Sequence, residues 1–383
     1  MVNNRPVLLI VLSIILAAGL LMSVRWRCLW RYVEAGFLLT DIADGASPRE
    51  LGESRSGVQR QQVAYQVQGR NRRADLYRWP GRVRVAVVLL PGVAEKGGED
   101  PRLVAFAQAL ARARFAVLVP ELAGLRQLRV SSADVAEVTD AVAWLSSRKE
   151  LAPSGRAGLA AFSYAAGPAV LAALNESIRD RVGFVFAVGG YYDLHRVLSY
   201  FTTGYYSHEG RQYSLPPDNY GKWAFVVGNI DRLHDAGDRR LLTALARRLQ
   251  RNPEAATQDL VAQLGGEGAA LWRFVANRDP QLVPALLKNL PGSIKDELSA
   301  LNLAEQNLAG LRAPLILIHG YEDAMIPFPE SIALAGAVSG RRSRLYLVHG
   351  LMHVDVAPGL PDRWRLLRAL RDLLAARDGD FPM

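Results

Sequence analysis

The stretch GLAAFSYAAG, residues 158–167, joins a short apolar run to a segment of small, helix-forming residues, with Ser163 at the junction. This order predicts a buried strand, a sharp turn and then a helix. A serine in such a turn is a candidate nucleophile, because the turn exposes its hydroxyl at the end of a sheet. The motif normally has glycine two residues before and after the serine, where Ala161 and Ala165 stand here. Alanine adds only one methyl group, so the motif is weakened but Ser163 stays a candidate.

Apolar runs and helical patterns alternate along most of the chain, which predicts parallel strands covered on both faces. Such an alternation gives right-handed crossovers and a doubly wound, mostly parallel sheet, so the predicted fold class is α/β. Ligands of these sheets bind at the carboxyl ends of the strands. The runs that predict the strands lie at residues 84–90, 115–119, 157–162, 183–188 and 314–318.

Two later strand ends carry further candidates. The segment LILIHGYEDAMIP, residues 315–327, places Asp323 in the loop after one strand, and LYLVHGLMHVDV, residues 345–356, places His353 after the next. The chain order is therefore serine, acid, histidine, which is the order of a nucleophilic triad on this type of sheet. Asp193 also follows a strand and is the alternative acid.

These motifs resemble the α/β-hydrolase superfamily over roughly residues 60–380, and within it the dienelactone-hydrolase-like enzymes, the esterases and the prolyl-oligopeptidase-type peptidases. The resemblance implies a serine hydrolase in which Ser163 attacks a carbonyl carbon, His353 accepts and returns the proton, and Asp323 orients the imidazole. It also implies an oxyanion hole made by the backbone N–H groups of Val93 and Tyr164. This chemistry needs no cofactor and no metal.

The remaining histidines do not form a metal site by their spacing. His319 and His349 stand beside glycines where strands end, which favours structural roles. His195, His208 and His234 are too scattered for the usual spacing of metal ligands. No metal is therefore expected.

Residues 195–312 interrupt the alternation, and the second half of this segment has helical periodicity. We expect a mostly helical cap over the strand ends. Its aromatic residues, together with two just before it, either line an apolar pocket or pack the cap against the sheet. They are Tyr191, Tyr192, Tyr200, Phe201, Tyr205, Tyr206, Tyr213, Tyr220 and Trp223.

The N-terminal region predicts a single-span membrane anchor. Residues 6–24 are nineteen uncharged residues, and as a helix they would span roughly 28 Å, close to a bilayer core of about 30 Å. Arg25, Trp26, Arg27 and Trp30 follow instead of a cleavage site, which favours a retained anchor over a cleaved signal. The arginines after the segment favour a large domain on the cytoplasmic side of a bacterial inner membrane.

The predicted organisation is an anchor at 1–33, a Gly-, Ser- and Arg-rich linker at 34–60, a hydrolase core at 61–194 and 313–383, and the cap between them. The net charge is +9, but the basic residues are dispersed, so no nucleic-acid partner is expected. Cys28 is the only cysteine, which excludes an intrachain disulfide. The sequence does not indicate an oligomeric state.

The sequence therefore predicts a membrane-anchored serine hydrolase of a small-molecule or lipid-like ester with an apolar acyl group. A non-catalytic binding or assembly module on the same scaffold, and a serine peptidase or thioesterase, are the alternatives.

Overall fold

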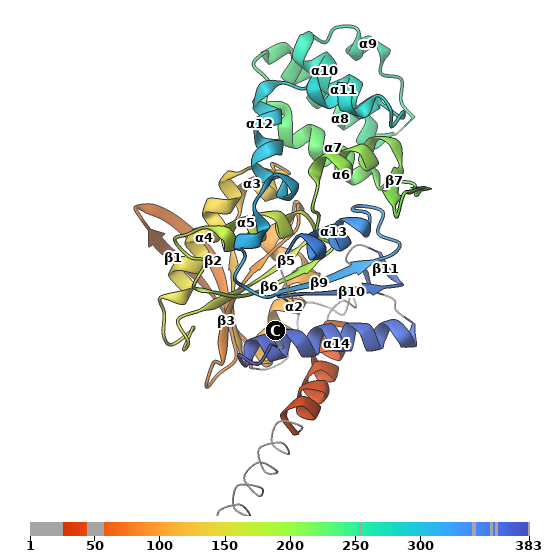
Figure 1. Ribbon diagram of the computed structural model, residues 1–383. Coiled ribbons are helices and arrows are strands. Elements are labelled where there is room, and N and C mark those ends of the chain that lie inside the picture. The colour runs from red at the N-terminus through yellow and green to blue at the C-terminus, as the bar shows by residue number, and fades with distance from the viewer. Residues whose placement is uncertain are drawn as a thin grey trace, which may run out of the picture.

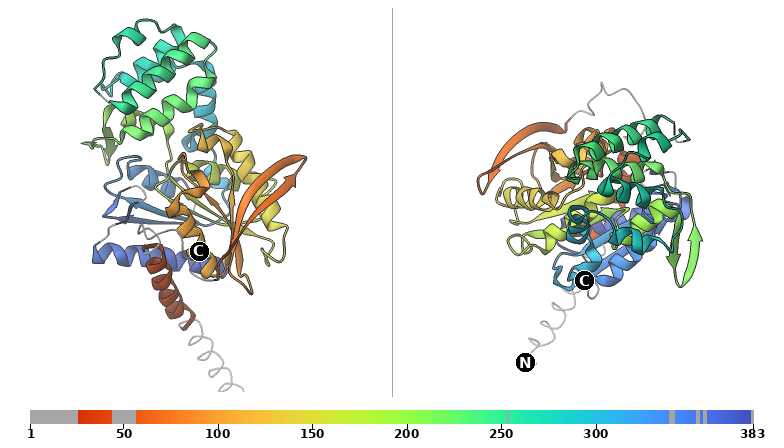
Figure 2. Two further views of the ribbon diagram at one scale, coloured as in Figure 1. Left: turned by 180° about the vertical axis from the view of Figure 1, so that it is seen from behind. Right: turned by 90° about the horizontal axis from the view of Figure 1, so that it is seen from above.

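The computed structural model describes residues 26–43, 57–252, 254–338, 342–352, 355–356 and 359–381 (Figure 1). A central sheet is covered by helices on both faces, and a second, helical layer lies over one end of it (Figures 1 and 2). The two faces of the sheet form two separate hydrophobic clusters.

The central sheet has eight strands in the order β1-β2-β4-β3-β5-β6-β9-β10. β1 and β2 form an antiparallel hairpin, β2 pairs antiparallel with β4, and the other strands are parallel. The predicted mostly parallel α/β sheet is thus confirmed. The strands are β1 Gln59–Val67, β2 Arg70–Arg78, β3 Val85–Leu90, β4 Phe115–Pro120, β5 Ala157–Phe162, β6 Val182–Val188, β9 Leu315–Gly320 and β10 Ser343–Val348.

The central strands are apolar along their whole length because helices cover both faces. Every residue of β3, β4 and β9 is buried. Helices α2 (Pro101–Arg112) and α14 (Leu360–Arg377) cover one face. Helices α4 (Ala133–Ser146), α5 (Ala166–Leu174) and α13 (Pro329–Ala337) cover the other.

In the sequence, the cap is inserted between β6 and β9, and it is largely helical (Figure 1). It also contains a two-stranded hairpin of β7 (Tyr205–His208) and β8 (Arg211–Ser214), which the sequence did not predict. The helices of the cap are α6 Leu194–Thr203, α7 Asn219–Asn229, α8 Ala236–Arg251, α9 Gln258–Val261, α10 Gly266–Ala276, α11 Val283–Lys288 and α12 Gly292–Leu301.

The expected linker at 34–60 needs correction at its start, because residues 26–43 form one helix that packs on the core. Ala35 and Leu38 of this N-terminal helix are buried in the cluster of α2 and α14. Arg31 pairs with Asp378 at 3.0 Å. Apolar residues at 35, 38, 39 and 42 share one helical face. This pattern indicates a packed helix, but the polar segment that follows led to the prediction of a linker.

Residues 57–60 also differ from a linker, since β1 begins at Gln59. Across the ranges described above, no helix has both the length and the apolar character needed to cross a bilayer. The predicted anchor at residues 6–24 lies outside those ranges.

Candidate active site

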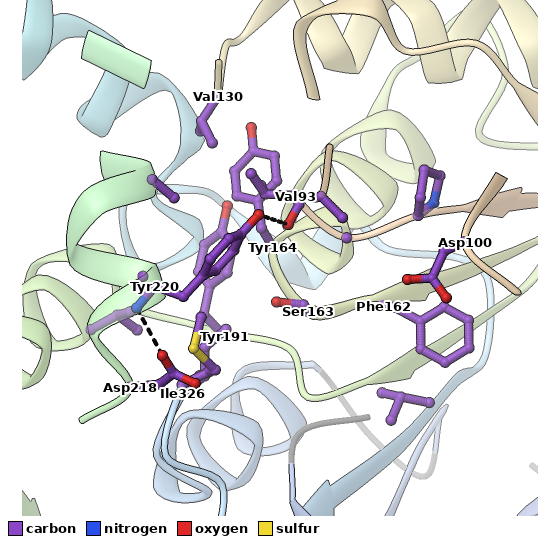
Figure 3. Close-up of a pocket in the computed structure, with 18 of the residues that line it drawn as sticks. Val93, Asp100, Val130, Phe162, Ser163, Tyr164, Tyr191, Asp218, Tyr220 and Ile326 are labelled. Carbon is purple, nitrogen blue, oxygen red and sulfur yellow. Dashed lines mark hydrogen bonds between the residues drawn. The ribbon is translucent and has the colours of Figure 1, made fainter. Parts of the chain in front are cut away.

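Ser163 lies at the sharp turn between β5 and α5. Phe162 is still extended, whereas Ser163 has a φ of +56° and begins a short 3-10 turn that leads into the helix. A non-glycine residue in this left-handed region is strained, and such strain is typical of a nucleophile turn. The Ser163 side chain points into a cavity, with Phe162 on one side and Tyr220 on the other (Figure 3).

The two alanines of the motif fit this turn. Ala161 and Ala165 are buried, with 0% and 1% of their surface exposed, so the structure encloses both methyl groups. The close contacts that require glycine lie elsewhere, at Gly167 in α5 and at Gly190 after β6. A Cβ at Gly167 would stand 1.9 Å from the Tyr191 hydroxyl, and one at Gly190 would stand 2.8 Å from the Ala166 Cβ.

The turn after β3 lies directly beside the nucleophile turn. A Cβ at Gly92 would stand 3.3 Å from the Ser163 Cβ and 3.5 Å from the Phe162 carbonyl oxygen. Val93 and Tyr164, the predicted oxyanion-hole residues, both line the cavity of Ser163. The structure therefore brings these two residues to Ser163, and their role as donors stays a prediction.

Asp323 is buried in the loop after β9, where its carboxylate is held by several groups. Its Oδ1 accepts hydrogen bonds from the backbone N–H groups of Met325, at 2.8 Å, and Ile326, at 2.9 Å. Its Oδ2 lies 3.3 Å from His319 Nε2. Met325 and Ile326 both line the cavity. The loop thus holds the Asp323 carboxylate next to residues that line the Ser163 cavity.

His319 has the structural role that the sequence favours. It is fully buried, its Nδ1 lies 2.6 Å from Ser331 Oγ, and its Nε2 lies 2.7 Å from the Ile326 carbonyl oxygen. His349 stacks on Tyr321 and bonds to Glu322 at the surface. None of the histidines in the described part of the chain lines the cavity.

His353, the predicted base, lies outside the described residues. Leu351 and Met352, immediately before it, form the short strand β11 (Leu351–Met352) and line the cavity. The chain therefore reaches the cavity just before the position of the predicted base.

Asp193, the alternative acid, has a different role in the structure. It caps α6, and its Oδ1 accepts a hydrogen bond from the His195 backbone N–H at 2.9 Å. Its own N–H donates to the buried carboxylate of Glu330 at 2.7 Å. Neither Asp193 nor Asp323 lines the cavity, so the choice of Asp323 as the acid stays a prediction.

The sequence did not identify a buried polar pair behind the nucleophile turn. The Tyr164 hydroxyl donates to Asp134 Oδ2 at 3.1 Å, and the same oxygen accepts from the Ser131 backbone N–H at 3.1 Å. Burial raises the pKa of Asp134 to about 7, although both hydrogen bonds oppose that rise. Asp134 therefore holds the side chain of Tyr164, the residue that follows Ser163.

The sequence also missed a contact between the cap and the turn after β3. The Tyr220 hydroxyl on α7 donates to the Val93 carbonyl oxygen at 3.1 Å (Figure 3). Asp218 caps the same helix by accepting from the Tyr220 N–H at 2.8 Å. The cap thus holds the peptide that follows the predicted oxyanion donor.

The cavity around Ser163 has a volume of about 1080 Å³ and a mainly apolar lining. Some of the aromatic residues in and near the cap line the cavity, and others do not. Tyr191, Phe201 and Tyr220 line the cavity, whereas Tyr205 and Tyr213 are exposed on the hairpin. Within the described residues, no group of histidine, cysteine, aspartate and glutamate side chains is arranged to hold a metal ion.

Comparisons with known proteins agree with this architecture. No protein-family model and no curated protein sequence matches the chain. Among solved structures, a provisionally named hydrolase of Legionella pneumophila is similar with a TM-score of 0.57 and 12% identity, over 91% of this chain and 96% of the other.

Two other solved structures are similar at lower scores. They are a dienelactone hydrolase of Anabaena variabilis (TM-score 0.45, 14% identity, 83% of this chain and 98% of the other) and an acylaminoacyl peptidase of Pyrococcus horikoshii (TM-score 0.42, 12% identity, 84% of this chain). The chain spans 40% of the length of that peptidase. The strand order, the nucleophile turn and the similarity to the Legionella protein together define the class: the chain has the α/β-hydrolase fold.

Proposed function

We propose that this protein is a membrane-anchored serine hydrolase that cleaves a carboxylic ester with an apolar acyl group. The observation that carries the proposal is the strained turn of Ser163, which faces a large, mainly apolar cavity beside the Gly92 turn. In the proposed reaction Ser163 Oγ attacks the ester carbonyl carbon, His353 takes its proton, and the alcohol leaves with that proton. Water then releases the acid from the acyl-enzyme.

The other residues support that reaction by orientation and charge. The Asp323 carboxylate orients the His353 imidazole and stabilises its positive charge. The N–H groups of Val93 and Tyr164 stabilise the negative oxygen that forms during the attack. The apolar lining favours an acyl group over a charged or strongly polar substrate.

The proposal is tested with a fluorophosphonate probe and p-nitrophenyl esters on the full chain in detergent. We expect the wild type to be labelled and to hydrolyse the esters, and Ser163→Ala to lose both, with a fall in kcat of at least about 10⁴-fold. Ser147→Ala is the matched control, because Ser147 is exposed at the end of α4 and bonds only locally.

Other outcomes assign the alternatives. Full labelling of Ser163→Ala would remove the nucleophile assignment. Labelling of the wild type without hydrolysis of any ester would favour a peptidase or a thioesterase. A wild type that is neither labelled nor active would favour a non-catalytic binding module.

The anchor and its orientation complete the proposal. Residues 6–24 hold the protein in a bacterial inner membrane, and the arginines that follow favour a cytoplasmic catalytic domain. A C-terminal reporter that is active only after export tests the orientation. We expect it to be inactive, and activity would place the domain on the opposite side.

A further inference from the structure

The apolar residues that line the Ser163 cavity form two sets, which belong to the hydrophobic clusters on opposite faces of the sheet, and the space lined by each set is called a lobe here. One, the cap-side lobe, is lined by Leu194, Val197, Leu198, Ala224, Ile294 and Leu298 of α6, α7 and α12. The other, the helix-side lobe, is lined by Leu39, Ile42, Leu103, Phe106, Leu366 and Leu370 of the N-terminal helix, α2 and α14. An ester bound at Ser163 can therefore place its two ends in different environments.

The helix-side lobe starts at the nucleophile itself. Phe162, the residue before Ser163, packs edge-on against Phe106 of α2 with 5.3 Å between ring centroids. Phe162 and Phe106 belong to the cluster on the α2 and α14 face, whereas Tyr164, directly after the nucleophile, belongs to the cluster on the cap face. The nucleophile turn thus lies at the junction of the two lobes.

The N-terminal helix closes the helix-side lobe. Its buried residues Ala35 and Leu38 pack on the core, and Leu39 and Ile42, half-buried, face the lobe. Asp41 pairs with Arg112 of α2 at 2.6 Å, which fixes the end of the helix that lies at the lobe. The wall of this lobe is therefore supplied by the segment that connects the catalytic domain to the predicted anchor.

The outer surfaces of the N-terminal helix and of the start of α14 carry several large apolar side chains. On the N-terminal helix Trp26, Trp30 and Phe37 are 68%, 52% and 70% exposed. On α14 Leu360 and Trp364 are 78% and 54% exposed. Clustered large apolar side chains of this kind are typical of a surface that contacts a membrane. Residues 6–24, which we propose as the membrane anchor, precede the same helix in the sequence, and this anchor would bring the surface to a bilayer rather than to a protein partner.

We propose that the helix-side lobe binds the linear acyl chain of a bilayer lipid ester, which enters from the membrane along the N-terminal helix, with the leaving alcohol in the cap-side lobe. The cavity of about 1080 Å³ reaches the upper end of the usual range for ligand pockets, roughly 300–1,000 Å³, so it exceeds the needs of a short acyl group. The chemistry of this inference rests on the proposed ester hydrolysis.

The binding part of the proposal is tested without catalysis, in the Ser163→Ala protein, with dansyl-undecanoic acid as the probe. We expect Ile42→Trp, which fills the helix-side lobe, to weaken binding at least tenfold. Leu298→Trp, the matched change in the cap-side lobe, should alter binding less than threefold. Leu39→Trp is the second helix-side variant if the first does not fold. Weaker binding in Leu298→Trp but not in the helix-side variants would overturn the assignment.

Measurements of catalysis separate the proposed ester hydrolysis from the proposed acyl-chain site. On the active protein, Ile42→Trp should lower the ratio of kcat/KM for p-nitrophenyl dodecanoate over acetate at least tenfold, since each buried methylene contributes roughly fourfold to binding. An unchanged ratio would overturn the acyl-chain assignment. If the wild type hydrolyses no ester, the proposed function fails, and the binding experiment still decides the site.

The membrane route is tested with the full chain in phosphatidylglycerol vesicles. A dodecanoyl ester embedded in the same vesicles should be hydrolysed at least tenfold faster than the same ester in separate, protein-free vesicles. Equal rates would mean that the chain enters from water and would overturn the route.

Discussion

At the scale of single residues, the nucleophile turn accommodates alanine where glycine is usual. Ala161 and Ala165 are enclosed, and the tightest contacts fall at Gly167 and Gly190 instead. The strain of the turn is concentrated at Ser163, whose φ is +56°. The altered motif is therefore compatible with the geometry of a nucleophile.

We predict that Ala161→Gly and Ala165→Gly keep fluorophosphonate labelling, because neither methyl group contributes to the chemistry. Each loses buried contacts and gains chain entropy in the unfolded state, so the free energy of unfolding should fall by about 1 kcal/mol. Thermal unfolding and labelling of the same samples measure both effects. Gly167→Ala is the contrasting change, since its Cβ would collide with the Tyr191 hydroxyl. Abolished labelling in either glycine variant would contradict this packing account.

Asp134 makes the free energy of unfolding of the protein depend on pH. Burial raises its pKa from 3.8 to about 7 in the folded protein. Between those values the folded state holds a proton that the unfolded state has lost, so the contribution of Asp134 to the free energy of unfolding decreases as pH rises through this range. Asp134→Asn has no such proton to lose.

We therefore predict that Asp134→Asn gains stability relative to the wild type between pH 5 and pH 8, by at least about 1 kcal/mol. Denaturant unfolding at the two pH values measures the difference. A difference between the two proteins that is independent of pH would show that Asp134 is already ionised at pH 5.

At the scale of elements, much of the fold could be predicted because its strands are buried on both faces. The apolar runs that mark β3, β4, β5, β6 and β9 are a direct consequence of that burial. The exposed β7–β8 hairpin has no such run, since all of β8 is exposed, and the sequence did not reveal it. The helical face of residues 35–42 was obscured by the polar segment that follows it.

The residues of the site likewise divide into those with a local sequence pattern and those without one. Ser163 and Asp323 could be predicted because Ser163 directly follows β5 and Asp323 lies in the loop after β9, where this type of sheet binds its ligands. Asp134 and Tyr220 could not, because they reach Tyr164 and Val93 across 30 and 127 residues of sequence. Only the packing of α4 and of the cap brings these side chains to the nucleophile.

Tyr220 links the position of the cap to the turn beside the nucleophile. We predict that Tyr220→Phe lowers kcat about three- to tenfold with a smaller change in KM, because the lost hydrogen bond loosens the Val93 peptide in the transition state. Steady-state kinetics with p-nitrophenyl butanoate measures both constants. Tyr213→Phe, on the exposed hairpin, is the control. A change in KM alone would make Tyr220 a substrate contact instead of a positioning residue.

At the scale of the whole molecule, the cavity at Ser163 is assembled from three parts of the chain. The sheet supplies Ser163 and the loop of Asp323, the cap covers one lobe, and the N-terminal helix closes the other. The helix is fixed to the core at both ends, through Arg31 with Asp378 and Asp41 with Arg112. Part of the segment predicted as a linker at 34–60, namely Leu39, Ile42 and Ala43, thus lines the cavity.

In the proposed reaction, Ser163 is a nucleophile activated by His353 and Asp323. The most direct measurement is peptide mapping by mass spectrometry of the full chain after reaction with a dodecyl fluorophosphonate. We predict a single adduct on Ser163, formed at least about 10²-fold more slowly in His353→Ala and slowed in Asp323→Asn, but unchanged in Asp193→Asn. An adduct on another residue, or an undiminished rate in His353→Ala, would show that Ser163 is not a nucleophile activated by His353.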